Sequence, residues 1–243
     1  MGYRRTVRTL LLDADDTLWE NNIYYVRSTA RFAELLGAYG IPRDETVAAL
    51  DACERETIRH LGYGPTSYRA SLVKTAIALL RSRDVEVDGD LVRRAMACAA
   101  ELFDPPTELL PDVAATLHRL YPSSRLVLLT KGEEPVQRAK VQSSGLAPLF
   151  DHIAIVPEKD VGTYRHLMRR LALAPEQTWM VGNSPRSDIN PAVEAGLGAI
   201  HIPHNHTWIA ERAQIAQSER VVILERFADL LPYFGIDGDA QMG

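Results

Sequence analysis

The sequence predicts an α/β fold in which a parallel sheet forms the core and an all-helical domain is inserted after the first strand. Two observations lead to this prediction. A short apolar strand at 7–12 is followed by a long stretch with helical periodicity and no convincing strand. After residue 107, strand-like and helical segments alternate, which is typical of right-handed βαβ units and therefore of a parallel sheet.

The inserted domain is predicted to span residues 20–106. Its apolar residues recur with the 3.6-residue period of an amphipathic helix, most clearly in the second half. The expected helices lie at 25–39, 46–61, 68–80 and 91–103. The Asp-Pro-Pro at 104–106 would end the insertion, because proline cannot continue a helix.

The core is predicted to consist of residues 1–19 and 107–235, with 236–243 as a disordered tail. Continuous apolar runs such as LVLL and WMV fit strands covered on both faces, as in a Rossmann-like sheet. Asp160 stands where a helix N-cap is expected, and Gly196 where a glycine would close the helix before it. The further strands are expected at 125–130, 152–156, 178–182, 199–202 and 221–224.

Composition excludes several kinds of protein. The net charge is −5 without a long single-sign run, which argues against nucleic acid as the main partner. No stretch approaches the roughly 20 apolar residues of a membrane span, and no signal peptide is evident, so a cytoplasmic protein is expected. Cys53 and Cys98 lie far apart and are expected to be free thiols on helices. The oligomeric state cannot be inferred.

Chemically useful side chains follow four of the predicted strands. In parallel α/β sheets, ligands bind beyond the carboxyl ends of the strands, so these side chains should gather at one edge of the sheet. Acids, two hydroxyls, two lysines and an Asn/Asp pair together are suited to binding a phosphate and a cation. In chain order, the residues are Asp13, Asp15, Thr17, Thr130, Lys131, Lys159, Asn183 and Asp188.

This set resembles the motifs of the haloacid dehalogenase (HAD) superfamily. Asp13, Asp15 and Thr17 match the family's DxDxT motif at the end of the first strand. Thr130 in LLLTKG matches the second motif, and Lys159 in VPEKD matches the third. The position of the helical insertion resembles the family's C1-type cap. The resemblance implies a HAD-like Rossmann core whose cap selects the substrate.

The resemblance also implies roles for these residues. Asp13 would be the nucleophile that forms an aspartyl-phosphate and would also ligate Mg²⁺. Asp15 would give its backbone carbonyl to the metal and act as general acid and base. Thr130 would bind the phosphoryl oxygens, and Lys159 would neutralise the nucleophile and the phosphate. Lys131 is a further candidate for phosphate binding.

The fourth motif, in GNSPRSD, departs from the family pattern. Asn183 stands where the family usually has an aspartate that ligates the metal directly. Asparagine still offers a carbonyl oxygen but removes one negative charge. Asp188 would bind metal-bound water or orient Lys159. Two readings stay open: Asn183 and Asp188 share the task, or the site is degenerate. Asp16, where the family usually has glycine, is expected to be exposed or to cap a helix.

The sequence therefore predicts a Mg²⁺-dependent phosphatase acting on a small phosphorylated metabolite. Three alternatives remain. A phosphomutase would use the same residues with water excluded. A 2-haloacid dehalogenase shares the fold and the nucleophile, but Asp15 argues against it, because dehalogenases of the family lack that acid. A non-catalytic phosphate-binding module is the third, supported by Asn183 alone.

Overall fold

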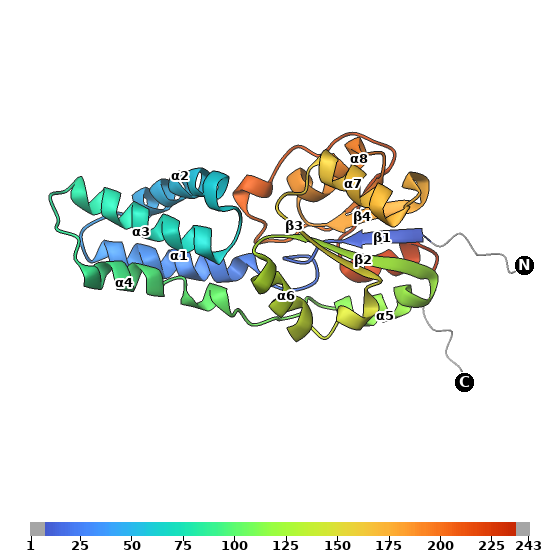
Figure 1. Ribbon diagram of the computed structural model, residues 1–243, viewed down its shortest axis with the longest axis horizontal. Helices are drawn as coiled ribbons and strands as arrows, with labels where there is room; N and C mark the ends of the chain where they lie inside the picture. Colours follow the sequence, from blue (N-terminus) through green and yellow to red (C-terminus); the bar gives the residue numbers. More distant parts are fainter. Residues whose placement is uncertain (1–7, 237–243) are drawn as a thin grey trace, which may run out of the picture. The chain divides into compact units, whose positions relative to one another are not determined.

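The computed structural model describes residues 8–236 of the chain, which divide into two compact units (Figure 1). One unit contains the residues up to 22, residues 107–131 and those from 137 onward. The other contains residues 23–106 together with the short segment 132–136. Of the predicted tail only Ile236 is described, and its backbone N–H donates to the carbonyl of Leu231 at 2.8 Å.

The first unit is built on a parallel six-stranded sheet, and this confirms the predicted α/β fold. The strand order is β3-β2-β1-β4-β5-β6, so the first strand lies in the middle of the sheet. Each strand was expected from an apolar run in the sequence. The strands are β1 (Arg8–Leu12), β2 (Ser124–Lys131), β3 (His152–Val156), β4 (Thr178–Gly182), β5 (Gly198–His201) and β6 (Val221–Ile223).

The strand register brings the ends of β1, β2 and β4 together. Leu12, the last residue of β1, is paired with Leu128 on one side and with Val181 on the other. The backbone N–H of Asp13 then donates to the carbonyl of Val181 at 2.9 Å. The residues that follow these three strands therefore emerge at the same edge of the sheet.

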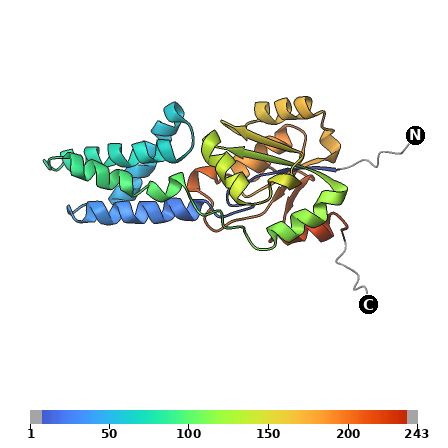
Figure 2. The same ribbon diagram turned by 60° about the horizontal axis from the view of Figure 1, so that its bottom comes forward.

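Helices cover both faces of the sheet (Figure 2). Alternate residues of β1 point to opposite faces: Leu10 and Leu12 belong to one apolar cluster and Leu11 to another. The first cluster includes residues of α5 (Val113–Leu120), α6 (Glu134–Ser143) and α9 (Leu230–Tyr233). The second includes residues of α7 (Val161–Leu171) and α8 (Asn190–Glu194).

Two predicted helix ends in this unit are confirmed. The Asp160 side chain accepts from the backbone N–H of Thr163 at 2.7 Å and so caps α7. Gly196 has a φ of +92° just after α8, and its N–H donates to the carbonyl of Val193.

The second unit is all-helical, with an apolar core of its own that includes Phe32, Leu36, Leu50 and Leu72. The last predicted helix is shorter than expected, because a 3-10 helix replaces its end at Ala100–Phe103. The Ser28 hydroxyl donates to the carbonyl of Cys98 at 2.7 Å. The backbone N–H of Leu102, which would donate to that carbonyl in an α-helix, donates to the carbonyl of Ala99. The helices are α1 (Asn22–Gly37), α2 (Arg43–Leu61), α3 (Pro65–Arg81) and α4 (Gly89–Ala97).

Both cysteines are free thiols; Cys98 is buried and Cys53 is half-buried. None of the helices between residues 8 and 236 combines the length and the apolar character that crossing a bilayer requires.

Candidate active site

The centre of the candidate site is a buried lysine held between two carboxylates. The ammonium of Lys159 donates to Oδ1 of Asp13 and, at 2.8 Å, to Oδ1 of Asp188. Asp13 is 6 % exposed, Lys159 3 % and Asp188 0 %. Asp13 follows β1, Lys159 follows β3 and Asp188 follows β4. These three residues are far apart in the sequence and meet at the edge of the sheet where the strands end.

Negative charge exceeds positive charge in this cluster. Burial is the largest cause that raises the pKa of Asp13 to about 7; the nearby Asp188 raises it further, against the opposing effect of Lys159. Burial works to lower the pKa of Lys159, but the attraction of Asp13 and Asp188 outweighs it and raises that pKa. A buried carboxylate with too little countercharge is the environment that a cation stabilises.

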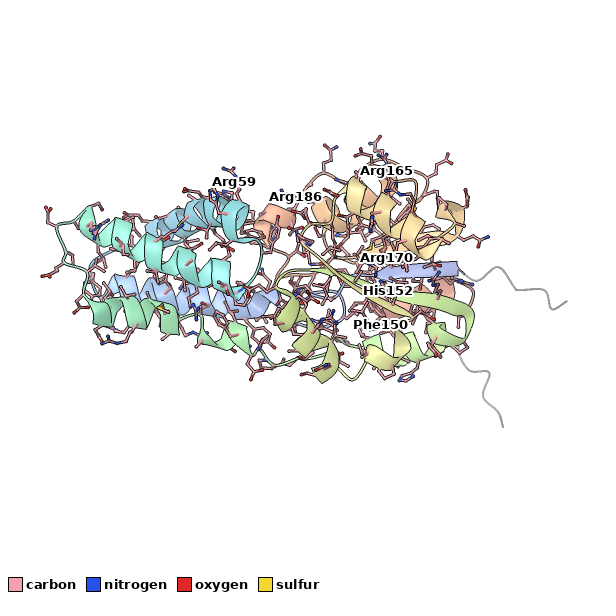
Figure 3. The ribbon with its side chains drawn as sticks, viewed as in Figure 1. Arg59, Phe150, His152, Arg165, Arg170 and Arg186 are labelled. Carbon is pink, nitrogen blue, oxygen red and sulfur yellow. The ribbon has the colours of Figure 1, made fainter. Side chains whose placement is uncertain are left out.

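Gly182, the last residue of β4, lets Asp188 approach the strand. A Cβ atom at position 182 would collide with the Asp188 carboxylate. Oδ2 of Asp188 also accepts the backbone N–H of Ser184 at 2.9 Å, so both oxygens of Asp188 have donors. Asp188 therefore holds Lys159 in this structure. Arg186, in the same turn, is exposed and donates to the carbonyl of Ala210 at 3.0 Å (Figure 3).

The amide of Asn183 is oriented by Thr207. The hydroxyl of Thr207 donates to the carbonyl of His204 at 2.9 Å, so its oxygen is left to accept from Nδ2 of Asn183, also at 2.9 Å. Oδ1 of Asn183 therefore points the other way, toward Thr17. The hydroxyl of Thr17 has one proton, and it lies closer to Oδ2 of Asp13 (3.0 Å) than to Oδ1 of Asn183 (3.4 Å).

This arrangement fits a hard cation. Asn183 is buried, and among the described residues its Oδ1 has a single, long contact of 3.4 Å with the Thr17 hydroxyl, which also donates to Oδ2 of Asp13. Oxygen ligands from carboxylates and amides are those that Mg²⁺ accepts. The oxygen donors of Asp13 and Asn183 are therefore suited to the Mg²⁺ ion that the motifs imply.

Asp15 faces a different set of partners. Its Oδ1 accepts from Nε1 of Trp19 at 2.8 Å and from the ammonium of Lys140 at 2.6 Å, and its Oδ2 accepts from Nε2 of Gln137 at 2.9 Å. Burial acts to raise the pKa of Asp15, but the attraction of Lys140 and these hydrogen bonds outweigh burial and lower it. Asp15 is therefore ionised at neutral pH.

Thr130 and Lys131 end β2 at the same edge of the sheet. Thr130 is buried, two residues beyond the Leu128 that pairs with Leu12. The ammonium of Lys131 lies 2.7 Å from Oε1 of Glu211 and 3.3 Å from Oε1 of Glu158. Both carboxylates offset the positive charge that was predicted to assist phosphate binding.

A second cluster, of Asp16, Glu20 and His204, lies next to the first motif. One potential ligand atom from each residue lies within 4.8 Å of the others. Asp16 is buried, and its Oδ1 accepts the backbone N–H groups of Asn21 and Asn22, so it caps the start of the following helix and is not exposed. Burial is the largest cause that raises its pKa to about 7.

Several of these contacts could not be read from motifs. Gln137 and Lys140 are three residues apart and so share a helix face, but the sequence does not show what that face contacts. Thr207 and Glu211 lie in a segment with little regular structure, where no periodicity points to them.

Comparison with known proteins is consistent with this geometry. The sequence model of haloacid dehalogenase-like hydrolases matches residues 7–196. A haloacid dehalogenase-like hydrolase from Xanthomonas campestris has a similar structure, with a TM-score of 0.77 and 28 % identity, covering 90 % of this chain and 89 % of that one. A HAD hydrolase from Bacillus subtilis bound to magnesium shares the fold at a TM-score of 0.62 and 20 % identity, covering 96 % of this chain and all of that one.

The phosphoglycolate phosphatase of Salmonella paratyphi A is 31 % identical over 144 residues, which are 56 % of this chain and 55 % of that protein. The match thus spans little more than half the length of that relative. The family match covers most of the chain, and the chain belongs to the haloacid dehalogenase-like hydrolase family.

Proposed function

We propose that this member of the haloacid dehalogenase-like hydrolase family is a Mg²⁺-dependent phosphatase that hydrolyses a small phosphorylated metabolite through a phosphoaspartate on Asp13. The observation that carries the proposal is the buried pair of Asp13 and Lys159 beside an amide oxygen of Asn183 that lacks a close donor. The phosphatase similar to this chain supports the same reaction class.

Asp13 is the proposed nucleophile. Its carboxylate attacks phosphorus, the bond from phosphorus to the leaving oxygen breaks, and that oxygen takes a proton from the Asp15 carboxyl group. Water then gives a proton to the Asp15 carboxylate and attacks phosphorus, and the Asp13 carboxylate is restored with release of inorganic phosphate. The Thr17 hydroxyl and the Lys159 ammonium each hold one of the two oxygens of Asp13 and so fix its direction.

Asp13 and Asn183 would hold the Mg²⁺, with the Asp15 backbone carbonyl as the third protein ligand that the family resemblance implies. When bound, Mg²⁺ supplies positive charge that offsets the carboxylate and the phosphoryl oxygens. Asp188 was predicted either to share metal binding with Asn183 or to orient Lys159. We assign it the second role, because its Oδ1 accepts from the Lys159 ammonium and its Oδ2 from the backbone N–H of Ser184.

Asp15 is the proposed acid and base, and Thr130 the proposed binder of the phosphoryl oxygens. Asp15 is ionised in the structure, which is the form that accepts a proton from the attacking water. To act as the acid in the first step, the same carboxyl group must carry a proton when the substrate binds. A substrate-selecting role for the helical unit and a cytoplasmic location remain predictions from the sequence.

A second candidate is a phosphate-binding module without turnover. The observation that favours it is Asn183, because asparagine supplies no negative charge to a metal. The two candidates differ in one respect, since only the enzyme releases phosphate.

The test is hydrolysis of p-nitrophenyl phosphate by the wild type with Mg²⁺, with a chelator, and by Asp13→Asn. We expect turnover that needs Mg²⁺ and is lost in the variant, with unchanged circular dichroism. A panel of phosphorylated metabolites, together with 2-chloropropionate, covers the other reactions of the fold. Halide release would identify a dehalogenase, and an isomerised phosphate ester a mutase. Phosphate binding without any product would favour the binding module.

A further inference from the structure

We propose that Lys140 is a positioning residue that holds the Asp15 carboxylate in one orientation, assisted by Gln137 and Trp19. The inference rests on the proposed function, in which Asp15 is the acid and base. None of these three side chains belongs to the four sequence motifs that resemble those of the family.

Lys140 is unusual because it is a buried lysine on a helix. It is 4 % exposed, and a lysine is seldom buried unless its charge is paired. Its ammonium donates to Oδ1 of Asp15 at 2.6 Å and to Oδ1 of Asn21 at 3.0 Å. The chain has only four lysines, and three of them, Lys131, Lys140 and Lys159, are paired with carboxylates at this edge of the sheet.

The donors around Asp15 leave little freedom to its carboxylate. An ionised carboxylate has about four acceptor positions, two on each oxygen. Trp19 and Lys140 fill both positions on Oδ1, and Gln137 fills one on Oδ2. Within residues 8–236, one acceptor position on Oδ2 has no donor, and we expect a leaving group or a water molecule to reach Asp15 there.

The three donors are themselves fixed. Trp19 is completely buried, and Gln137 is 4 % exposed and also donates to the carbonyl of Lys131 at 3.2 Å. Oε1 of Gln137 is buried, and no residue between 8 and 236 donates a hydrogen bond to it. Leaving a buried oxygen without a hydrogen bond costs free energy. The Gln137 amide nevertheless has the orientation in which its NH₂ group donates to Asp15.

Lys140 also supplies the positive charge that Asp15 needs in this position. Asp13 and Asp16 are acidic neighbours in the sequence, and Lys159 is occupied by Asp13 and Asp188. Without Lys140, the Asp15 carboxylate would lose the ammonium group that pairs with it and its fixed direction. Misplacing a catalytic group by about 1 Å can lower a rate by about 100-fold.

The test is the variant Lys140→Met, which keeps the length of the side chain and removes the charge. We expect kcat to fall about 10- to 100-fold with little change in KM. The loss in kcat/KM should be larger for an alkyl phosphate than for p-nitrophenyl phosphate, because kcat/KM reports formation of the phosphoenzyme, and in that step only the poor leaving group needs a proton from Asp15. Lys74→Met, at an exposed lysine of α3, is the matched control and should behave as wild type.

A double-mutant cycle with Asp15→Asn separates positioning from general support of the fold. If Lys140 acts through Asp15, then Lys140→Met should cost nothing further in the Asp15→Asn background. Equal losses in kcat/KM for both substrates, or the same loss in both backgrounds, would overturn the inference. Gln137→Met should show the same pattern with a loss of a few-fold, and it serves the test if Lys140→Met does not fold.

The two proposals can fail separately. An inactive wild type, or an Asp15→Asn variant with full activity, would contradict the proposed function. An active wild type, an impaired Asp15→Asn and a Lys140→Met variant equal to Lys74→Met would leave that function intact and refute the role of Lys140.

Discussion

Asp13 and Asp15 are two residues apart, yet they lie in opposite electrostatic environments. Burial and the neighbouring Asp188 raise the pKa of Asp13 to about 7 in spite of Lys159. The pKa of Asp15 is lowered in spite of burial, because Lys140, Gln137 and Trp19 stabilise its charge. The same residue type thus gains two roles from its surroundings. Asp13 shares the Lys159 ammonium with Asp188, so a further cation would stabilise its charge, whereas Lys140 already balances the charge of Asp15.

The largest expected effect tests the Asp13 side. Asp13→Asn should lower kcat by about 10⁴-fold or more, because an amide oxygen is a poor nucleophile and cannot form the acyl phosphate. Steady-state release of phosphate from an aryl phosphate measures this loss. Substantial turnover by Asp13→Asn, together with complete loss of turnover in Asp15→Asn, would contradict the assignment of Asp13 as the nucleophile.

A second variant changes the support of Asp13 without touching its carboxylate. Gly182→Ala would push against the Asp188 carboxylate, so we expect a loss of about 1–3 kcal/mol in the free energy of unfolding. Thermal denaturation measures it, with Gly37→Ala as the control, because a Cβ at position 37 meets nothing within 4 Å. Equal melting temperatures for the two variants would contradict the close approach of Asp188.

A third variant tests the amide beside Asp13. Thr207→Val removes the acceptor that orients Asn183, so Mg²⁺ should bind about 10-fold more weakly. Titration calorimetry on the metal-free protein measures the affinity. Asn183→Asp should keep or raise it, and in that background Thr207→Val should matter little, since both carboxylate oxygens are equivalent. A large loss of affinity or activity in Asn183→Asp would count against the placement of this residue.

The smallest effect is on stability as a function of pH. The pKa of Asp13 is about 7 in the folded protein against an ordinary 3.8, so the folded state holds this proton more tightly. Its contribution to the free energy of unfolding is therefore present below pH 4 and is lost as the pH rises to about 7. Melting temperatures without Mg²⁺ should show this fall, and Mg²⁺ should reverse it at pH 8.

Asp13→Asn sharpens that measurement. Asp16 and Glu54 also have pKa values raised to about 7, chiefly by burial, so part of the slope should persist in the variant. An unchanged slope in Asp13→Asn would mean that Asp13 has no raised pKa.

The groups that surround Asp13 could largely be predicted from the sequence, whereas the groups that surround Asp15 could not. Asp13, Lys159 and Asp188 follow parallel strands, and topology alone gathers such residues at one edge. Lys140 and Gln137 lie on a helix, where the packing of the whole unit decides which carboxylate they meet. For the same reason, the sequence could not show that Lys131 faces Glu211, or that Thr207 turns the amide of Asn183.

The most direct test of separate roles is to look for the phosphoenzyme. Wild type, Asp13→Asn and Asp15→Asn are mixed with p-nitrophenyl phosphate and Mg²⁺, quenched in acid, and examined by intact-protein and peptide mass spectrometry. The proposed roles predict that Asp15→Asn accumulates one phosphoryl group on the peptide containing Asp13, because water is no longer activated, and that Asp13→Asn carries none. Release of phosphate by the wild type with no phosphoryl group on that peptide in any variant would contradict them.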